Sequence, residues 1–181
     1  MLISKPITAQ SANLELIEQL YCDAFLPDAR TPLKKLLHFA EKGTTRFLGW
    51  YDEDSLAGFS YTLCKDGLLF VAYLAVNGAV QSKGYGSRIL QQLEEDNPHC
   101  ALVLEVETTD GEHENSEQRA RRTAFYLKNG FMHAGFKVLD TGITYDVLVK
   151  DGNCTPAQLA ALYEYFSDPP EYPVSLPEFI A

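Results

Sequence analysis

Two segments near the start of the chain repeat apolar residues at helical spacing. LISKPIT, residues 2–8, suits a first strand, and Ser11 then stands where an N-cap would precede a helix. A second, short helix is predicted from Thr31 and Pro32 to a stop at Gly43. The apolar faces of these helices comprise Leu14, Ile17, Leu20, Tyr21, Ala24 and Phe25 in the first, and Leu33, Leu36, Leu37 and Ala40 in the second.

Three apolar runs of the next segment are separated by short polar turns. TRFLGWY, LAGFSYTLC and LLFVAYLAV are joined by DEDS and KDG, a pattern typical of strands connected by tight turns. We therefore expect an antiparallel meander over residues 45–76.

The remainder of the chain alternates between helical and extended patterns. A helix is predicted from Gly84 to about Glu95, a strand at CALVLEV, and a second helix that ends at Lys128. Strands at FMHAGFKV and ITYDVLVK follow, joined by a turn at DTG. A helix opened by Thr155 and Pro156 comes next, and then a proline-rich tail that we expect to be extended. The order βααβββαβαββα predicts an α+β fold with helices packed on a mixed sheet.

Composition narrows the class of protein. The chain has 181 residues, 46% hydrophobic content and a formal net charge of -10, which fits one globular domain and disfavours nucleic acid and anionic membranes as partners. The longest apolar run, Leu68–Val76, is less than half of the roughly 20 residues that span a bilayer, and MLISKPIT lacks the apolar stretch of a signal peptide. These features predict a soluble, cytoplasmic protein.

The spacing of cysteines and histidines does not indicate a metal site. The four histidines show no HxxxH spacing, and the four cysteines show no CxxC spacing, so neither a zinc site nor a redox pair is suggested. We expect no metal and reduced thiols. The residues are His38, His99, His113 and His133, and Cys22, Cys64, Cys100 and Cys154.

Residues 81–87, QSKGYGS, connect the most apolar strand to the next helix. Amides at a helix start have no partner within the helix, and glycines leave room for a bulky phosphate group to approach them. Alone, this motif is weak and favours a turn that tightens strand–helix packing, because the third glycine of a dinucleotide fingerprint and the GK[ST] of a Walker loop are missing.

The motifs in order resemble the GNAT N-acetyltransferase superfamily. A strand ending LAV, a QxxGxG helix start, a strand ending LEV and a helix carrying FYxxxGF carry the resemblance over Leu68–Phe136. It implies a mostly antiparallel sheet splayed between its fourth and fifth strands, with acetyl-CoA as co-substrate. The residues to which it assigns cofactor binding are Leu74 and Val76 by their backbone, Gln81, Ser82, Lys83, Gly84, Tyr85, Gly86 and Ser87 for the pyrophosphate, and Arg119.

Three residues are candidates for the chemistry. Acetyl transfer to an amine requires a proton acceptor for the ammonium group and a proton donor for the departing thiolate. The resemblance gives the donor role to Tyr126 and the base role to Glu105, and Glu107 shares the strand face of Glu105. A packed tyrosine ring and solvent-facing carboxylates are the structural alternatives.

An acidic segment from Glu105 to Glu117 precedes three arginines. Its six carboxylates could attract a cationic acceptor or could be an ordinary solvated loop. Arg119, Arg121 and Arg122 could pair with that segment, hold a CoA phosphate or bind an acceptor carboxylate, and ion pairing is the preferred interpretation. The resemblance implies an asparagine that contacts the cofactor at the position of Arg119, and this sequence departs from that pattern.

The predicted function is transfer of the acetyl group of acetyl-CoA to a primary amine of a small molecule or peptide. The alternative is a catalytically weak acyl-CoA-binding sensor or regulatory module. Residues 1–150 would form the acetyltransferase domain, and residues 151–181 a helix and tail packed on the same domain or on a partner subunit, which leaves a homodimer open. Phe25, Arg30 and Trp50 could contact the acceptor, but burial of an aromatic side chain needs no such reason, and core packing is the preferred interpretation.

Overall fold

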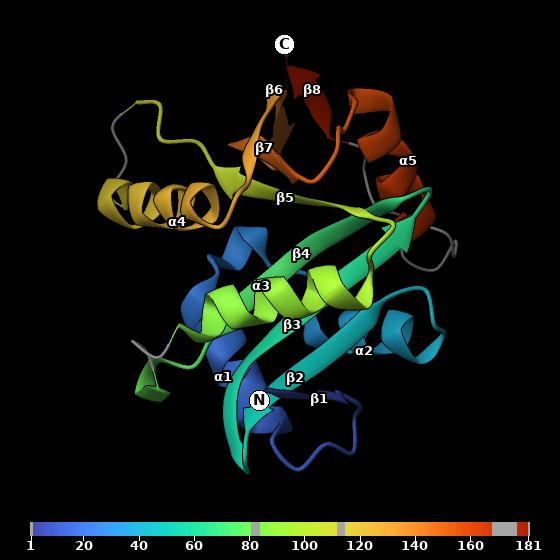
Figure 1. Ribbon diagram of the computed structural model, residues 1–181, viewed down its shortest axis with the longest axis vertical. Coiled ribbons are helices and arrows are strands. Elements are labelled where there is room, and N and C mark those ends of the chain that lie inside the picture. The colour runs from blue at the N-terminus through green and yellow to red at the C-terminus, as the bar shows by residue number, and fades with distance from the viewer. Residues whose placement is uncertain (1, 81–83, 112–114, 168–176, 181) are drawn as a thin grey trace. The chain divides into compact units, whose positions relative to one another are not determined.

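The computed structural model describes residues 2–80, 84–111, 115–167 and 177–180 (Figure 1). These residues form a sheet of eight strands in the order β1-β2-β3-β4-β5-β7-β6-β8. Of the strand pairs whose register is recorded, β4 and β5 run parallel and the others are antiparallel. The strands are β1 Ile3–Pro6, β2 Arg46–Asp52, β3 Ser55–Lys65, β4 Leu68–Val76, β5 Ala101–Glu107, β6 Met132–Asp140, β7 Ile143–Lys150 and β8 Glu178–Ile180.

Helices connect and flank these strands. Helices α1 and α2 lie between β1 and β2, α3 between β4 and β5, and α4 between β5 and β6, while α5 follows β7. The mixed α+β architecture predicted from the periodicities is therefore confirmed. The bounds are α1 Leu14–Ala24, α2 Leu33–Glu41, α3 Tyr85–Asp96, α4 Ser116–Lys128 and α5 Pro156–Ser167, with short 3-10 segments at Pro27–Ala29 and Gly78–Val80.

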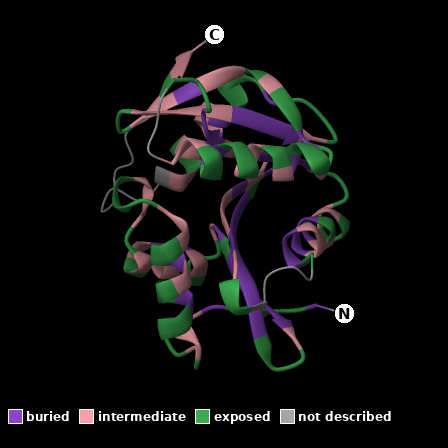
Figure 2. Ribbon diagram, turned by 90° about the vertical axis from the view of Figure 1, so that its left-hand side faces the viewer, coloured by how far each residue is buried: buried purple, intermediate pink, exposed green. Residues whose placement is uncertain are grey.

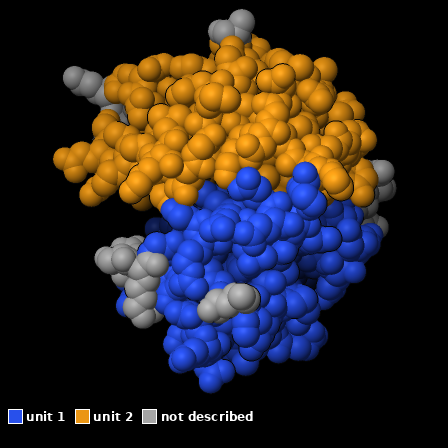
Figure 3. Space-filling view, viewed as in Figure 1, with its two compact units in different colours: residues 1–63, 71–98 blue, residues 64–70, 99–181 orange. Residues whose placement is uncertain are grey.

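The chain forms two compact units, coloured separately in Figure 3. The first comprises residues 1–63 and 71–98, and the second comprises residues 64–70 and 99–181. The sequence-based division into residues 1–150 and 151–181 differs from these two units. It stays a prediction.

Aromatic packing organises the first unit. Trp50 is fully buried and donates its indole N–H to Ser60 Oγ (2.9 Å), and Phe59 is equally buried. Tyr73 of β4 packs edge-on against Tyr21 and accepts the Thr31 N–H at its hydroxyl (3.1 Å). Trp50 is therefore a core residue, as the packing alternative predicts.

The second unit is built around β5, which pairs with β7 along most of its length. Leu102, Leu104 and Val106 are buried, whereas the helices expose part of their surface, as Figure 2 shows. The parallel ladder places Leu68, Leu69 and Phe70 opposite Ala101, Leu102 and Val103. None of the recorded β4–β5 pairs includes a described β4 residue after Phe70, as expected for a sheet that splays at this point.

Tight turns close the hairpins where the sequence predicts them. Asp66 and Gly67 both have positive φ (49° and 77°), as do Thr141 and Gly142 (48° and 81°). Positive φ at both central residues is the geometry of a two-residue type I′ turn, which matches the twist of the adjoining strands. The KDG and DTG segments therefore fix the registers of β3 with β4 and of β6 with β7.

One local prediction is wrong. Asn13, not Ser11, precedes α1, because the Ser11 hydroxyl accepts the Thr8 N–H (2.9 Å) in a preceding turn. In the described end of the tail, Glu178–Ile180 is extended and pairs with β6 as strand β8, a strand that the sequence does not predict. Of the helices that the structure describes, none is long and apolar enough to cross a membrane.

Candidate active site

Helix α3 begins with an unusual backbone geometry. Gly84 is its N-cap, with φ 69° and ψ 20° in the left-handed region that glycine adopts without strain. Its carbonyl accepts the Arg88 N–H (3.1 Å), so the amides of Tyr85, Gly86 and Ser87 are the first helical N–H groups and have no partner within the helix. A Cβ at Gly84 would meet no atom within 4 Å. This end of the helix combines the N–H groups of a first helical turn with open space at Gly84, as an anion site requires.

The side chains around this helix start face the protein interior. The Tyr85 ring is buried, and its hydroxyl donates to Asp52 Oδ2 (2.5 Å). The Arg88 guanidinium lies over the same ring at 5.2 Å from its centroid. The predicted contribution of Tyr85 to a phosphate site is therefore limited to its backbone amide. Gln81, Ser82 and Lys83, which complete the predicted cradle, lie outside the described residues.

The two predicted backbone contacts of the strand lie at the end of β4. Leu74 and Val76 are partly buried and follow the last residue paired with β5, which is Phe70. Asn77 marks the end of the strand by donating its N–H to Ala57 O (2.9 Å). The role of Leu74 and Val76 in cofactor binding stays a prediction.

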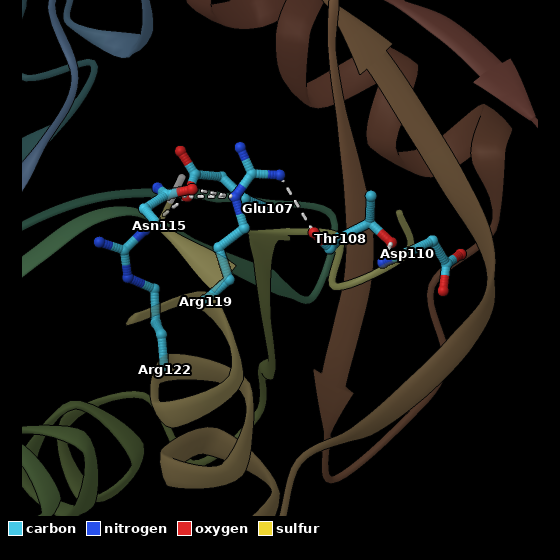
Figure 4. A network of polar contacts seen from close by, with 6 residues as sticks. All are labelled: Glu107, Thr108, Asp110, Asn115, Arg119 and Arg122. Carbon is cyan, nitrogen blue, oxygen red and sulfur yellow. Dashed lines mark hydrogen bonds and ion pairs between the residues drawn. The ribbon is translucent and has the colours of Figure 1, made fainter. Parts of the chain in front are cut away.

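Glu107 lies in a buried polar network between β5 and α4 (Figure 4). Its Oε2 is 3.5 Å from Arg119 Nε and 3.6 Å from Arg122 Nη1, and it accepts a hydrogen bond from Asn115 Nδ2 (3.3 Å). Glu107 and Arg119 are only 6% and 8% exposed, so this ion pair is shielded from solvent. Two guanidinium groups thus pair with one carboxylate in this network.

Arg119 forms hydrogen bonds and an ion pair with other residues of the second unit. Its Nε donates to Asn115 Oδ1 (2.7 Å) and its Nη1 to the Thr108 carbonyl (3.1 Å). The structure thus shows the ion pairing that the sequence favours for this residue. Its predicted cofactor contact stays a prediction, and its described partners all belong to the protein.

Glu105 occupies a different environment two residues earlier. Both of its carboxylate oxygens accept the Tyr163 hydroxyl of α5 at 2.7 Å. Burial raises the pKa of Glu105 to about 7, the Tyr163 hydrogen bond lowers it, and the negative charge of Asp140 raises it. The Tyr163 pKa is raised well above its ordinary value by the same burial and by Glu105. The two glutamates share a strand but bind different helices.

Tyr126 lies on the inner side of α4. It is 8% exposed and packs edge-on against Phe125 and Phe131, with ring centroids 5.1 Å and 5.6 Å apart. Burial raises the pKa of Tyr126 to about 12, and the positive charge of Arg122 lowers it. The hydroxyl is therefore protonated at neutral pH, as a proton donor must be, and among the described residues it has no recorded hydrogen-bond partner.

The acidic segment is largely neutralised where it is described. Asp110 pairs with Lys137, which also lies 3.5 Å from Asp146. Glu117 is 3.8 Å from Arg121, one helical turn away. These pairs favour the solvated-loop alternative over a site that attracts cations.

Several functional partners are not evident from the sequence. Tyr163, Asn115, Thr108 and Asp140 set the environments of the two glutamates, yet none belongs to a recognisable motif. The only available signal was helical periodicity, which places Tyr163 on the buried side of α5. Within the described parts of the chain, no group of three or more His, Cys, Asp and Glu side chains could hold a metal ion.

Comparison with known protein families identifies the family of this chain. The profile of the Acetyltransferase (GNAT) domain family matches residues 43–133, half of the chain, including α3, β5 and α4. The chain belongs to the GNAT acetyltransferase family. The resemblance inferred from the motifs is therefore confirmed. No curated protein matches the chain.

Solved structures of GNAT proteins share the fold. A protein from Bacteroides thetaiotaomicron assigned to the GNAT family is 24% identical, covers 96% of this chain and 99% of its own, and superposes with a TM-score of 0.73. The ribosomal-protein-S18-alanine N-acetyltransferase of Escherichia coli is 16% identical (86% and 96% covered, TM-score 0.61). A GNAT acetyltransferase from Elizabethkingia anophelis with acetyl-CoA bound is 14% identical (82% and 97% covered, TM-score 0.56).

The raised pKa of Glu105 predicts a stability that depends on pH. The folded pKa of about 7 exceeds the ordinary carboxyl value, so this group's contribution is fully present below about pH 4.3 and is lost as pH rises through 7. Glu105→Gln, which is neutral at every pH, should raise the free energy of unfolding by roughly 2–3 kcal/mol at pH 8 and change it little at pH 4. Urea unfolding at the two pH values measures the difference.

Glu117→Gln is the matched control, because Glu117 is 91% exposed and its ion pair is a surface pair. It should change stability by less than about 0.5 kcal/mol at either pH. A Glu105→Gln protein that is less stable than the parent at pH 8 would show that the carboxylate is not destabilised by burial.

Proposed function

We propose that this GNAT protein transfers the acetyl group of acetyl-CoA directly to a primary amine of a small molecule or peptide. The observation that carries the proposal is the start of α3, where the N–H groups of the first helical turn follow a left-handed Gly84 at which an added Cβ would meet no atom within 4 Å. Such a helix end suits the pyrophosphate of coenzyme A. The acetyl-CoA bound to the Elizabethkingia protein supports this choice of co-substrate.

An amine acceptor is supported by the environment of Glu105. An ordinary amine, with a pKa near 10.4, is mostly protonated at neutral pH and must lose a proton before it attacks the thioester. A general base is most effective when its pKa lies near the working pH, and the pKa of Glu105 is about 7. Glu107 is the less suitable candidate, because it is already paired with Arg119 and Arg122. The acetylation of an amine by the Escherichia coli S18-alanine enzyme supports the same class of acceptor.

Tyr126 is the proposed donor to the departing thiolate. When the thioester carbonyl is attacked, the carbon–sulfur bond breaks and the thiolate takes a proton. Burial makes Tyr126 a weaker acid by raising its pKa to about 12, whereas the positive Arg122 one turn away lowers that pKa and so favours release of the proton. Glu105, the proposed base, and Tyr126, the proposed proton donor, both belong to the second unit. Substitutions in the full chain at these two positions test the two roles.

Release of free thiol provides the main test. The full chain is incubated with acetyl-CoA and a pool of amines, and free coenzyme A is followed with a thiol reagent. Tyr126→Phe should lower turnover by ~10²-fold while leaving acetyl-CoA affinity within about twofold, the weight of a lost proton donor. Tyr165→Phe is the matched control, because Tyr165 is an exposed tyrosine of α5 and its variant should keep full turnover.

Unaltered turnover in Tyr126→Phe would remove Tyr126 as the acid. Tight binding of acetyl-CoA without turnover by the parent protein over a broad pool would instead favour the sensor or regulatory module, which needs the cofactor site but neither Tyr126 nor Glu105.

The pH dependence of turnover tests Glu105 as the base. The Tyr163 hydrogen bond stabilises the charged carboxylate, so Tyr163→Phe should raise the Glu105 pKa further. The acidic limb of the kcat/KM profile should then move to higher pH by about 0.5–1 unit, and Glu105→Gln should abolish that limb. Glu107→Gln should leave its position unchanged. A limb that shifts in Glu107→Gln but not in Tyr163→Phe would transfer the base role to Glu107.

Added side chains at the start of α3 test the cofactor site. Gly86→Leu should weaken acetyl-CoA affinity by about tenfold or more, measured by calorimetry. Because Gly86 is buried, Gly84→Ala serves as a second variant: its methyl group meets no protein atom within 4 Å and costs only the strain of a left-handed alanine. Unchanged affinity in both variants, each folded by circular dichroism, would contradict a phosphate site at this helix end.

A further inference from the structure

Two cysteines that are distant in the sequence meet in the second unit. Cys64 lies near the end of β3 and Cys100 directly before β5, and their Sγ atoms are 3.3 Å apart although 36 positions separate them. A disulfide bond is about 2.05 Å long, so a movement of about 1.3 Å would bring the two sulfurs to bonding distance. The sequence does not suggest this pair, because the two thiols belong to no CxxC motif.

The backbone around the pair is well defined by hydrogen bonds. The type I′ turn at Asp66 and Gly67 directs the chain from β3 into β4, and the Gly67 carbonyl accepts the Ala101 N–H (2.9 Å). Leu68 then pairs with Ala101 as the first rung of the parallel ladder. Cys64 lies four positions before Leu68 and Cys100 directly before Ala101, so the sheet itself holds the thiols together.

The two thiols differ in access to solvent. Cys64 is exposed and Cys100 is partly buried. Burial raises the pKa of Cys100 to about 11, and the neighbouring Cys64 raises it too, so Cys100 stays a thiol at neutral pH. An exposed thiol beside a protonated one is the arrangement in which the first is oxidised and the second resolves the product.

We propose that Cys64 and Cys100 form a reversible, redox-sensitive disulfide. With a peroxide as oxidant, the Cys64 thiolate attacks hydrogen peroxide, an S–O bond forms, the O–O bond breaks, and hydroxide leaves. The Cys100 sulfur then attacks the sulfenic acid, an S–S bond replaces the S–O bond, and the Cys100 proton leaves with the hydroxyl group as water. A dithiol reductant reverses the reaction by thiol–disulfide exchange.

The disulfide would close a loop that contains β4 and α3. Cross-linking two residues this far apart restricts the unfolded chain much more than the folded one. The oxidised protein should therefore be more stable than the reduced protein, provided that the bond forms without straining the sheet. This consequence does not depend on the proposed acetyltransferase activity.

Peptide mapping tests the proposal directly. The full chain carrying Cys22→Ser, which removes the exposed thiol of α1, is treated with hydrogen peroxide, alkylated and digested with trypsin without reductant. We expect residues 47–65 joined to residues 89–119, at a mass two hydrogens below the sum of the peptides, and separated again by dithiothreitol. The apparent Tm should rise by about 5 °C or more on oxidation and return on reduction.

Cys64→Ser and Cys100→Ser in the same background are the controls. Neither should give the linked peptide or the Tm rise, and Cys100→Ser should instead accumulate over-oxidised Cys64, because no neighbour resolves the sulfenic acid. If the protein with both cysteines yields free or over-oxidised Cys64 and no linked peptide, the proposal is overturned. A linked peptide that persists in dithiothreitol would overturn its reversibility.

Discussion

Burial of two carboxylates on strand β5 is the constraint on which the second unit depends. A charge removed from water is costly unless it is paired or becomes neutral, and β5 shows both solutions two residues apart. Glu107 is paired with Arg119 and Arg122, so α4 supplies its compensation. Glu105 is held by the Tyr163 hydroxyl, and its pKa rises to about 7, so α5 supplies a hydrogen bond in place of a cation. Each carboxylate thereby fixes one helix to the strand, and replacing either would disturb more than a single contact.

The fold was predictable because local signals and the global arrangement agree. Alternating and helical apolar patterns locate the long strands and the helices, and the KDG and DTG turns have the left-handed geometry that their composition predicts. The signals fail where an element is short or its cap ambiguous. Strand β8 has three residues, too few for a periodicity, and depends on pairing with β6. Ser11 carries the composition of an N-cap, yet its hydroxyl serves the preceding turn, and the helix begins after Asn13.

Only those residues of the candidate site that belong to a sequence motif were predictable. The glycines of the α3 start and the FYxxxGF helix identify the family, but they say nothing of what surrounds Glu105, because Tyr163 is 58 positions away in the sequence. The same holds for Cys64 and Cys100, which are brought together by the β4–β5 ladder. Contacts between distant segments follow from sheet order, and no local pattern in the chain encodes that β7 lies between β5 and β6.

The divergence of the two glutamates bears on the proposed chemistry. A base must release and regain a proton near neutral pH, which requires that its charged and neutral forms have similar free energies in the site. The phenol at Glu105 opposes desolvation without cancelling it, and this balance is what leaves the pKa near 7. Glu107 lies in a different arrangement, because its carboxylate is paired with Arg119 and Arg122, and Arg119 is itself held by Asn115 and the Thr108 carbonyl. A carboxylate that already forms two ion pairs is poorly placed to accept a hydrogen bond from an incoming amine, so Glu105 is the proposed base.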